Sequence, residues 1–261
     1  MSNEESCCFT VKFPVEQLFH RQVSRGTVNM SRPCCSTLRT PEPGMLSPDL
    51  PEISPLEFEE NLRRISPQPL PARAVDALFK HYQELRRWNR SLSLIGPGTV
   101  QEVLSRHYGE SLAALALIPD GFREILDLGS GAGFPGLVLA AVLPGARVTL
   151  VEARQKKWAF LEAAARNAAL SCRGLNVRVA LSLPPGLPTE IDLITARAIK
   201  LPGEVLSRLA ERMSAEGRML FWAGEDLPER PPSWEVSNEV PLVGSVRRRI
   251  VEFRRTTNTS G

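Results

Sequence analysis

Hydrophobic residues recur every three or four positions in two segments that begin just after residue 53. Ser54, with Glu57 three residues later, forms a capping-box pattern, and the helix that it starts is predicted to end before Pro67. A second helix is predicted after Pro71, because its apolar residues fall on one face: Val75, Leu78, Phe79, Tyr82, Leu85 and Trp88. With a third helix over roughly 99–117, the pattern predicts an N-terminal helical region over 53–120.

From residue 121 onward, short apolar runs alternate with helical periodicity. Strands are predicted over 125–128, 147–151, 176–180, 191–195 and 218–222, and helices over 137–143, 155–170 and 202–213. This alternation is typical of a parallel, doubly wound α/β sheet with helices on both faces. Two further runs, 234–240 and 248–253, are joined without a helix, so we expect an antiparallel last strand. The core is therefore predicted over 121–255.

Both ends of the chain lack this periodicity. Residues 1–52 mix Cys, Ser, Pro and Arg, so we expect a disordered leader or a wrongly assigned start, with a disordered tail over 256–261. The adjacent pairs Cys7-Cys8 and Cys34-Cys35 lack the two-residue gap of common zinc knuckles, so no metal site is predicted.

The bulk composition permits several partners. The hydrophobic fraction is 43% and the formal net charge is +3, which allows an RNA partner without requiring one. No run approaches the roughly 18 apolar residues that span a membrane, and the N-terminus has no signal-peptide pattern. We expect a cytoplasmic monomer with no membrane contact.

A glycine-rich turn follows the first predicted strand, in the sequence Asp127-Leu-Gly-Ser-Gly-Ala-Gly-Phe-Pro-Gly136. Glycines there let the backbone approach a ligand that a Cβ would block. Gly131-x-Gly133-x-x-Gly136 matches the dinucleotide fingerprint, but Asp127-x-Gly129-x-Gly131-x-Gly133 resembles motif I of S-adenosylmethionine-dependent methyltransferases. A carboxylate at Asp127 would repel a pyrophosphate, which favours the methyl donor. The remaining alternative is a turn that binds no ligand.

Two more residues extend this nucleotide-binding unit. Glu152 lies at the tip of the second predicted strand, where its carboxylate can accept hydrogen bonds from both ribose hydroxyls. Phe134 lies within the turn and is expected to pack beside the cofactor.

Several motifs together resemble one family, the small-subunit rRNA guanine-N7 methyltransferases, also called the glucose-inhibited division protein B family. The resemblance covers about residues 55–255. It rests on Trp88-Asn89, Leu92, Leu94, His107 and Ser111, on the Phe-Pro-Gly ending of motif I, on Thr149-Leu-Val-Glu152, on Lys156-Lys157 and Phe160-Leu161, and on Asp192-Leu-Ile-Thr-Ala-Arg-Ala198.

The resemblance implies an S-adenosylmethionine-dependent methyltransferase that acts on N7 of a guanosine in small-subunit (16S) rRNA, either free or in the small ribosomal subunit. It implies that Arg197 is catalytic. It also implies a cofactor site made of Asp127, Gly129, Gly131, Gly133, Phe134, Glu152, Ser182, Leu183 and Arg197. Ser182 and Leu183 are assigned by counting back from Arg197 without gaps. Because N7 carries no proton, this chemistry needs no general base, only positioning and a preorganised field.

The chain departs from the family pattern at several positions. It has Ser93-Leu-Ile95 where Asn-Leu-Thr is usual, Glu110 where Asp is usual, and Ala223-Gly224 where Lys-Gly is common. These departures keep two alternatives open: a methyltransferase for another RNA or a small molecule, and a non-catalytic RNA-binding ribosome-assembly protein. The intact glycine turn argues against the second.

Basic residues that could bind RNA phosphates are spread along the chain. His107 is expected to make a structural hydrogen bond. Arg247, Arg248 and Arg249 alternate faces, so they cannot all reach one partner. The other candidates are Arg86, Arg87, Arg90, Arg106, Arg154, Lys156 and Lys157.

Overall fold

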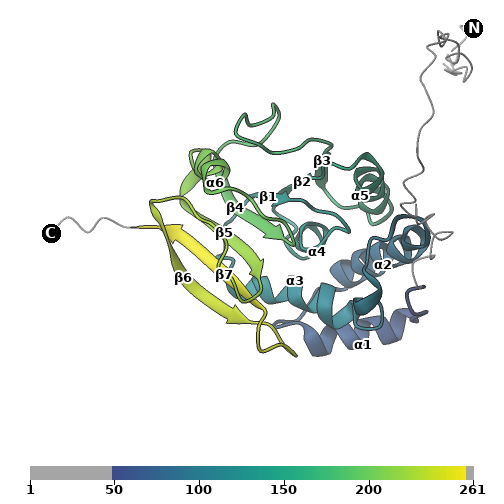
Figure 1. The fold of residues 1–261 in the computed structure, drawn as a ribbon. Helices are drawn as coiled ribbons and strands as arrows, with labels where there is room; N and C mark the ends of the chain where they lie inside the picture. Colours follow the sequence, from purple (N-terminus) through teal and green to yellow (C-terminus); the bar gives the residue numbers. More distant parts are fainter. Residues whose placement is uncertain (1–48, 257–261) are drawn as a thin grey trace, which may run out of the picture. The chain divides into compact units, whose positions relative to one another are not determined.

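The computed structural model describes residues 49–256, in which the strands form one seven-stranded sheet of order β3-β2-β1-β4-β5-β7-β6 (Figure 1). The neighbours among β1 to β5 pair in parallel, and β7 runs antiparallel to both β5 and β6. This confirms the predicted fold class, including the antiparallel last strand. The strands are β1 (Glu124–Leu128), β2 (Arg147–Val151), β3 (Cys172–Leu175), β4 (Ile191–Arg197), β5 (Met213–Ala223), β6 (Trp234–Pro241) and β7 (Arg249–Arg255).

Helices cover both faces of the sheet, as predicted. Successive side chains of a strand point to opposite faces, so in β1 Ile125 joins one hydrophobic cluster while Leu126 and Leu128 join the other. The helices α2 (Ala72–Leu92), α4 (Gly136–Val142) and α5 (Gln155–Asn167) contribute to the first cluster, and α6 (Gly203–Ala210) contributes to the second. Figure 1 shows α6 on the opposite side of the sheet from α4.

The predicted first two helices form, with α1 spanning Pro55–Ile65. The Ser54 hydroxyl accepts a hydrogen bond from the Glu57 backbone N–H (3.2 Å), which is the predicted N-cap. Aromatic rings join the helices to one another: the Phe58 ring lies 5.4 Å from those of Tyr82 and Tyr108. The N-terminal helices therefore share one core with α4 and α5.

The predicted continuous third helix is wrong. The segment is divided into η1 (Pro97–Thr99), the π-helix η2 (Leu104–Gly109), α3 (Glu110–Leu112) and the 3₁₀ turn η3 (Ala113–Ala116). Gly109 lowers helix propensity here, and a Cβ there would lie 3.5 Å from Ile65 Cδ1. The carbonyl of Arg106 accepts a hydrogen bond from Arg197 (2.7 Å), so a tertiary contact uses a group that a regular helix would bond internally.

Two strand boundaries also differ from the prediction. β3 is formed by Cys172–Leu175, paired with Val148–Val151, and the segment 176–180 is not a strand. Pairing ends where β2 ends, and the alternating Val177 and Val179 pack against the second hydrophobic cluster as part of a loop. β5 begins at Met213, where a helix was expected to continue, because Met213 already pairs with Ile191.

The boundary of the predicted leader is placed too late. Leu50 is 4% exposed, the Tyr82 hydroxyl donates to the Pro51 carbonyl (2.5 Å), and Asp49 accepts from Arg90 (2.8 Å). Residues 49–52 therefore belong to the folded region. The rest of the leader with Cys7, Cys8, Cys34 and Cys35, and the tail from residue 257, lie outside the described residues.

Candidate active site at the carboxyl edge of the sheet

A cavity of about 660 Å³ opens where β1, β2 and β4 end. Ligands bind at this edge in open parallel sheets, because the loops that follow the strands meet there. Its lining comes from the glycine turn, from the β2 tip, from the loops after β3 and β4, and from the N-terminal region: Leu94, Ile95, His107, Leu128–Ala132, Phe134, Val151–Arg154, Lys157, Val177–Val179 and Arg197–Pro202.

The three alternating glycines have distinct roles in the turn. Gly129, Gly131 and Gly133 all have positive φ (68°, 53° and 85°), a conformation that side-chain-bearing residues rarely adopt. A Cβ at Gly129 would lie 2.6 Å from Ile199 Cγ2, and one at Gly133 would lie 2.5 Å from Leu137 Cδ1. A Cβ at Gly131 would meet only the Gly129 carbonyl, at 3.6 Å. Gly131 thus leaves room on the cavity side, whereas Gly133 does not line the cavity.

Asp127 lies beneath the turn and not in the cavity. It is 0% exposed, its Oδ1 accepts a hydrogen bond from Thr195 Oγ1 (2.7 Å), and its Oδ2 has no hydrogen-bond partner within residues 49–256. Burial raises the pKa of Asp127 to about 6, against the opposing effect of the Thr195 hydrogen bond. Asp127 therefore joins the ends of β1 and β4, and its direct contact with a cofactor stays a prediction.

Glu152 connects the tip of β2 to the glycine turn. Its Oε2 accepts a hydrogen bond from Gly131 N–H (3.0 Å) and its Oε1 accepts one from Arg154 N–H (2.7 Å). Glu152 lines the cavity although its side chain is largely buried. A carboxylate offers about four acceptor positions, so both oxygens can still accept hydroxyl donors.

Arg197 reaches the same cavity from the end of β4. Its Nη2 donates to the Arg106 carbonyl and to Glu110 Oε2, both at 2.7 Å. Its side chain is 15% exposed, and Nη1 has no hydrogen-bond partner within residues 49–256. Burial and the neighbouring Arg106 lower the pKa of Arg197 to about 10, which leaves it a cation at neutral pH. The next residue, Ala198, has a φ of +57° and also lines the cavity.

Glu110 is the common partner of three arginines. Arg197, Arg106 and Arg248 all form ion pairs with its carboxylate, and Trp222 Nε1 donates to its carbonyl (2.9 Å). The sequence shows Glu110 only as a departure from the family pattern. Its role follows from tertiary contacts with residues up to 138 positions away, of which only Arg106, four residues earlier, is a signal in the sequence.

Two histidines support the site as neutral side chains. His107 Nε2 lies 3.0 Å from Thr99 Oγ1, and burial and three nearby arginines lower the pKa of His107 to about 3. This agrees with the predicted structural role. His81 was not recognised in the sequence, because it lies within the apolar face of α2. Its ring nitrogens lie 3.0 Å from the Ala132 carbonyl and 2.9 Å from the Tyr108 hydroxyl, so it supports the turn from below.

The assignment of Ser182 and Leu183 to the cofactor site is not supported by their positions. Neither lines the cavity: Ser182 is exposed and Leu183 packs against the second hydrophobic cluster. Residues 177–179 line it instead, because β3 ends at Leu175 and the chain crosses the carboxyl edge at once. Phe134, by contrast, lines the cavity and is 6% exposed, with its ring 5.2 Å from that of His107.

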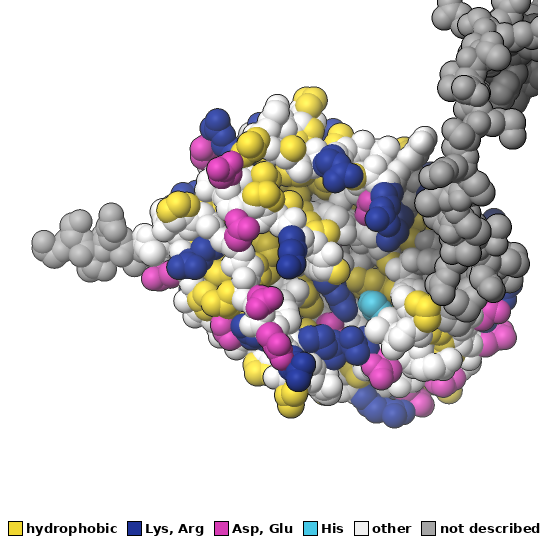
Figure 2. Space-filling view, in the orientation of Figure 1, with side chains coloured by type: hydrophobic (Ala, Val, Ile, Leu, Met, Phe, Trp, Pro, Cys, Tyr) yellow, Lys and Arg dark blue, Asp and Glu magenta, His cyan; other side chains and the backbone are white. Residues whose placement is uncertain are grey.

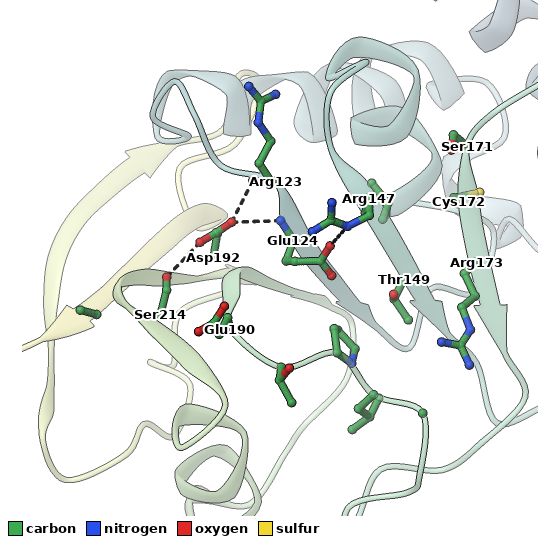
Figure 3. Close-up of a pocket in the computed structure, with 16 residues that line it drawn as sticks. Arg123, Glu124, Arg147, Thr149, Ser171, Cys172, Arg173, Glu190, Asp192 and Ser214 are labelled. Carbon is green, nitrogen blue, oxygen red and sulfur yellow. Dashed lines mark hydrogen bonds and ion pairs between the residues drawn. The ribbon is translucent and has the colours of Figure 1, made fainter.

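A larger cavity, of about 1150 Å³, lies at the opposite, amino edge of the strands (Figure 3). Asp192 accepts hydrogen bonds there from the backbone N–H groups of Arg123 (2.8 Å) and Glu124 (3.0 Å) and from the Ser214 hydroxyl (3.0 Å). Although partial burial acts in the other direction, these hydrogen bonds hold the pKa of Asp192 below its usual value. The central groups of this cavity therefore bond to one another.

Within residues 49–256, no group of three or more His, Cys, Asp or Glu side chains could hold a metal ion. In the same part of the chain, no helix combines the length and the apolar composition needed to cross a membrane.

The fold and the site together define an S-adenosylmethionine-dependent methyltransferase: the sheet order with an antiparallel β7, the glycine turn after β1 and the acid at the end of β2 meet at one cavity. The sequence profile of the family described as "GidB: rRNA small subunit methyltransferase G" matches residues 75–243. The chain belongs to this family.

Curated relatives agree with this assignment. "Ribosomal RNA small subunit methyltransferase G" of Gluconobacter oxydans is 34% identical over 60% of this chain and 80% of its own length. The proteins of the same name from Rhodospirillum rubrum and Methylobacterium radiotolerans are 37% and 36% identical, over 66% and 68% of this chain and 85% and 86% of their own lengths. The predictions of the family, of rRNA methyltransferase activity and of S-adenosylmethionine as cofactor are thereby confirmed.

Proposed function

We propose that this chain transfers a methyl group from S-adenosylmethionine to N7 of a guanosine in small-subunit (16S) rRNA, as a cytoplasmic monomer, and that the carboxyl-edge cavity is its active site. One observation carries the proposal: Gly131, Glu152 and Arg197, from three separate strand ends, line one cavity. Family membership supplies the substrate class.

The lining residues fit the cofactor. The open position beside Gly131 admits a ligand close to the backbone, and Glu152 is placed to accept hydrogen bonds from ribose hydroxyls. The buried and unpartnered Nη1 of Arg197 can donate to a carboxylate or to a guanine oxygen. S-adenosylmethionine supplies an activated methyl group when bound; the protein residues provide the binding surface and its orientation.

Methyl transfer to guanine N7 requires no proton transfer by the protein. The N7 lone pair forms the new bond to carbon while the carbon–sulfur bond breaks, and its electrons stay on sulfur. His107, the only histidine in the lining, has a pKa of about 3 and stays neutral, so it neither adds a cation nor acts as a useful base at neutral pH. Catalysis would therefore rest on alignment in a preorganised cavity.

Arg197 is the residue that we propose to align the reacting groups. Glu110 and the Arg106 carbonyl fix the position of Nη2, so the plane of the guanidinium is set before any ligand binds. A fixed plane presents the remaining nitrogen at one angle, which a flexible lysine cannot do.

The test is methylation of defined RNA by the purified protein. Labelled S-adenosylmethionine is incubated with a 16S rRNA transcript and, separately, with purified small ribosomal subunits, and nucleosides are analysed by mass spectrometry. We expect N7-methylguanosine from at least one substrate, and less of it with Glu152→Ala at cofactor concentrations that saturate only the wild type. A methylated nucleoside of another kind, or no transfer to either substrate, would contradict the proposal. Leu94 and Ile95, which line the cavity and follow the altered Ser93, would then be the first residues to examine.

A further inference from the structure

The carboxyl-edge cavity has an uneven charge balance. Five basic side chains line it, and Glu152 is its only acid. Arg197 is tied to Glu110, but the other four have no side-chain hydrogen bond or ion pair within residues 49–256. We call these four the cationic rim: Arg154, Lys157, Arg178 and Lys200. Figure 2 shows Lys and Arg side chains spread over the face turned to the viewer, with hydrophobic surface between them.

Many other basic residues that the sequence offers for RNA binding are already neutralised. Arg86 pairs with Glu52 and Arg90 pairs with Asp49 on α2. Arg247, Arg248 and Arg249 pair with Glu225, Glu110 and Glu239 respectively, so they do reach three different partners. Arg154, Lys157, Arg178 and Lys200 thus remain available for a ligand at the mouth of the proposed active site.

The rim is built at a cost in stability. Arg154 is the N-cap residue of α5, Lys157 lies in its first turn, and this turn contains no acid. Cations there oppose the helix dipole, by roughly 0.3–1 kcal/mol each. Arg178 and Lys200 come from the loops after β3 and β4, so three separate segments direct like charges at one opening. Glu152 is the only acid in the lining to offset this repulsion, and an anionic ligand would offset more of it.

The cofactor is not that ligand. S-adenosylmethionine carries one carboxylate against an ammonium and a sulfonium, so its binding adds positive charge to the cavity. RNA phosphates carry one negative charge per nucleotide and are the natural counter-charge.

We propose that the cationic rim holds the phosphates on both sides of the target guanosine in an unpaired RNA segment; this rests on the function proposed above. Guanine N7 faces the deep, narrow major groove of an A-form duplex, which protein side chains do not enter. A base has to leave the stack to reach a cavity of about 660 Å³. Contacts to phosphates on either side would hold the strand while the base enters.

The test compares two triple variants that remove the same charge from opposite edges of the sheet. The rim variant is Arg154→Gln/Arg178→Gln/Lys200→Gln. The control is Arg123→Gln/Arg147→Gln/Arg173→Gln, whose residues line the amino-edge cavity. Binding of the 16S rRNA transcript and of small subunits is measured over a range of salt concentrations, and the unfolding temperature is measured by scanning calorimetry.

For the rim variant we expect RNA affinity to fall at least tenfold at 0.1 M salt, and the salt slope to decrease by about 2, since each lost phosphate contact removes about 0.7–0.9. The unfolding temperature of the rim variant should stay close to that of the wild type, which excludes a folding defect. The control should bind RNA with a slope close to that of the wild type. A single-stranded RNA competitor should displace the transcript better than a duplex of the same length.

Failure of the inference and failure of the proposed function are distinguishable. If the wild type methylates 16S rRNA but both triple variants bind alike, the rim does not hold the RNA. An equal loss in both variants would mean that only net charge matters, which also overturns the inference. If the rim variant alone loses RNA binding but the wild type makes no N7-methylguanosine, RNA binding by the rim is supported and the proposed reaction is contradicted.

Discussion

The two ends of the parallel strands carry cavities of opposite chemical character. At the amino edge, three basic and three acidic side chains line about 1150 Å³, and Asp192 and Glu124 accept bonds from their neighbours. At the carboxyl edge, five basic side chains and one acid line about 660 Å³, and four of the cations have no partner within residues 49–256. The larger cavity is thus the chemically balanced one. The net charge of the lining distinguishes the two edges better than volume does.

The largest effect is expected from Arg197→Lys. The lysine keeps the charge but loses the fork that contacts Glu110 and the Arg106 carbonyl, so the reacting groups lose their alignment. We expect methylation to fall about 100-fold, the scale for misplacement of a positioned group. Single-turnover rates on the transcript and on small subunits measure this. If Arg197→Lys methylates both substrates at the wild-type rate, the role of Arg197 is limited to its ion pair with Glu110.

Glu152→Ala should come next. Losing a charge-assisted acceptor costs about 1.5–3 kcal/mol, and the N–H groups of Gly131 and Arg154 lose their partner as well. The dissociation constant for S-adenosylmethionine, measured by calorimetry, should rise about 10- to 150-fold. Glu124→Gln removes an acid from the amino edge as the matched control and should leave this constant unchanged. If Glu152→Ala and the wild type bind the cofactor with equal affinity, Glu152 does not contact it.

Asp192→Ala tests the opposite edge. It leaves two backbone N–H groups and the Ser214 hydroxyl without their acceptor, so the free energy of unfolding should fall by about 1–3 kcal/mol. Because the folded-state pKa of Asp192 is lowered, this stabilisation is present above the unfolded pKa and is lost as pH falls through the folded pKa. Urea unfolding should show a smaller difference in the free energy of unfolding between the wild type and Asp192→Ala at pH 3 than at pH 7. A loss of cofactor affinity would contradict the assignment of this edge to structure alone.

The smallest effect is expected from Arg147→Gln. Arg147 is 74% exposed and pairs with Glu124, and exposed pairs of this kind contribute about 0–1 kcal/mol. Thermal unfolding should change little, and RNA affinity should be unchanged. A marked loss of RNA binding would extend the functional surface to the amino edge.

The sequence predicts those parts of the fold whose local pattern and tertiary packing agree. β2 was predicted over 147–151 and forms there, because its apolar run is bounded by polar residues and paired on both sides. β3 was misplaced, because Val177 and Val179 alternate like a strand while they pack as a loop. The third helix was predicted as regular, because periodicity does not reveal that Arg197 takes the carbonyl of Arg106.

The site was predictable where backbone conformation dictates the residue. The sequence pattern selects Gly131 and Glu152, which both line the cavity, because a left-handed turn and an acid at a strand tip are visible in sequence. The sequence motif identifies Asp127 but does not predict how deeply its side chain is buried. In the structure, the side chain is buried against Thr195. Ser182 and Leu183 do not line the cavity, because a gap-free count assumes a constant loop length, which only the three-dimensional path of the chain decides.

At the end of β4, the backbone conformation of Ala198 sets thermal stability against a fixed direction for Arg197. A non-glycine residue at a φ of +57° raises the energy of the folded chain by roughly 1–2 kcal/mol. Glycine would relieve that strain, but it would also let the backbone after Arg197 sample many more conformations. Selection for thermal stability alone would therefore favour a residue that loosens the backbone next to Arg197. Alanine at this position thus restricts the backbone that directs Arg197, at a cost in thermal stability.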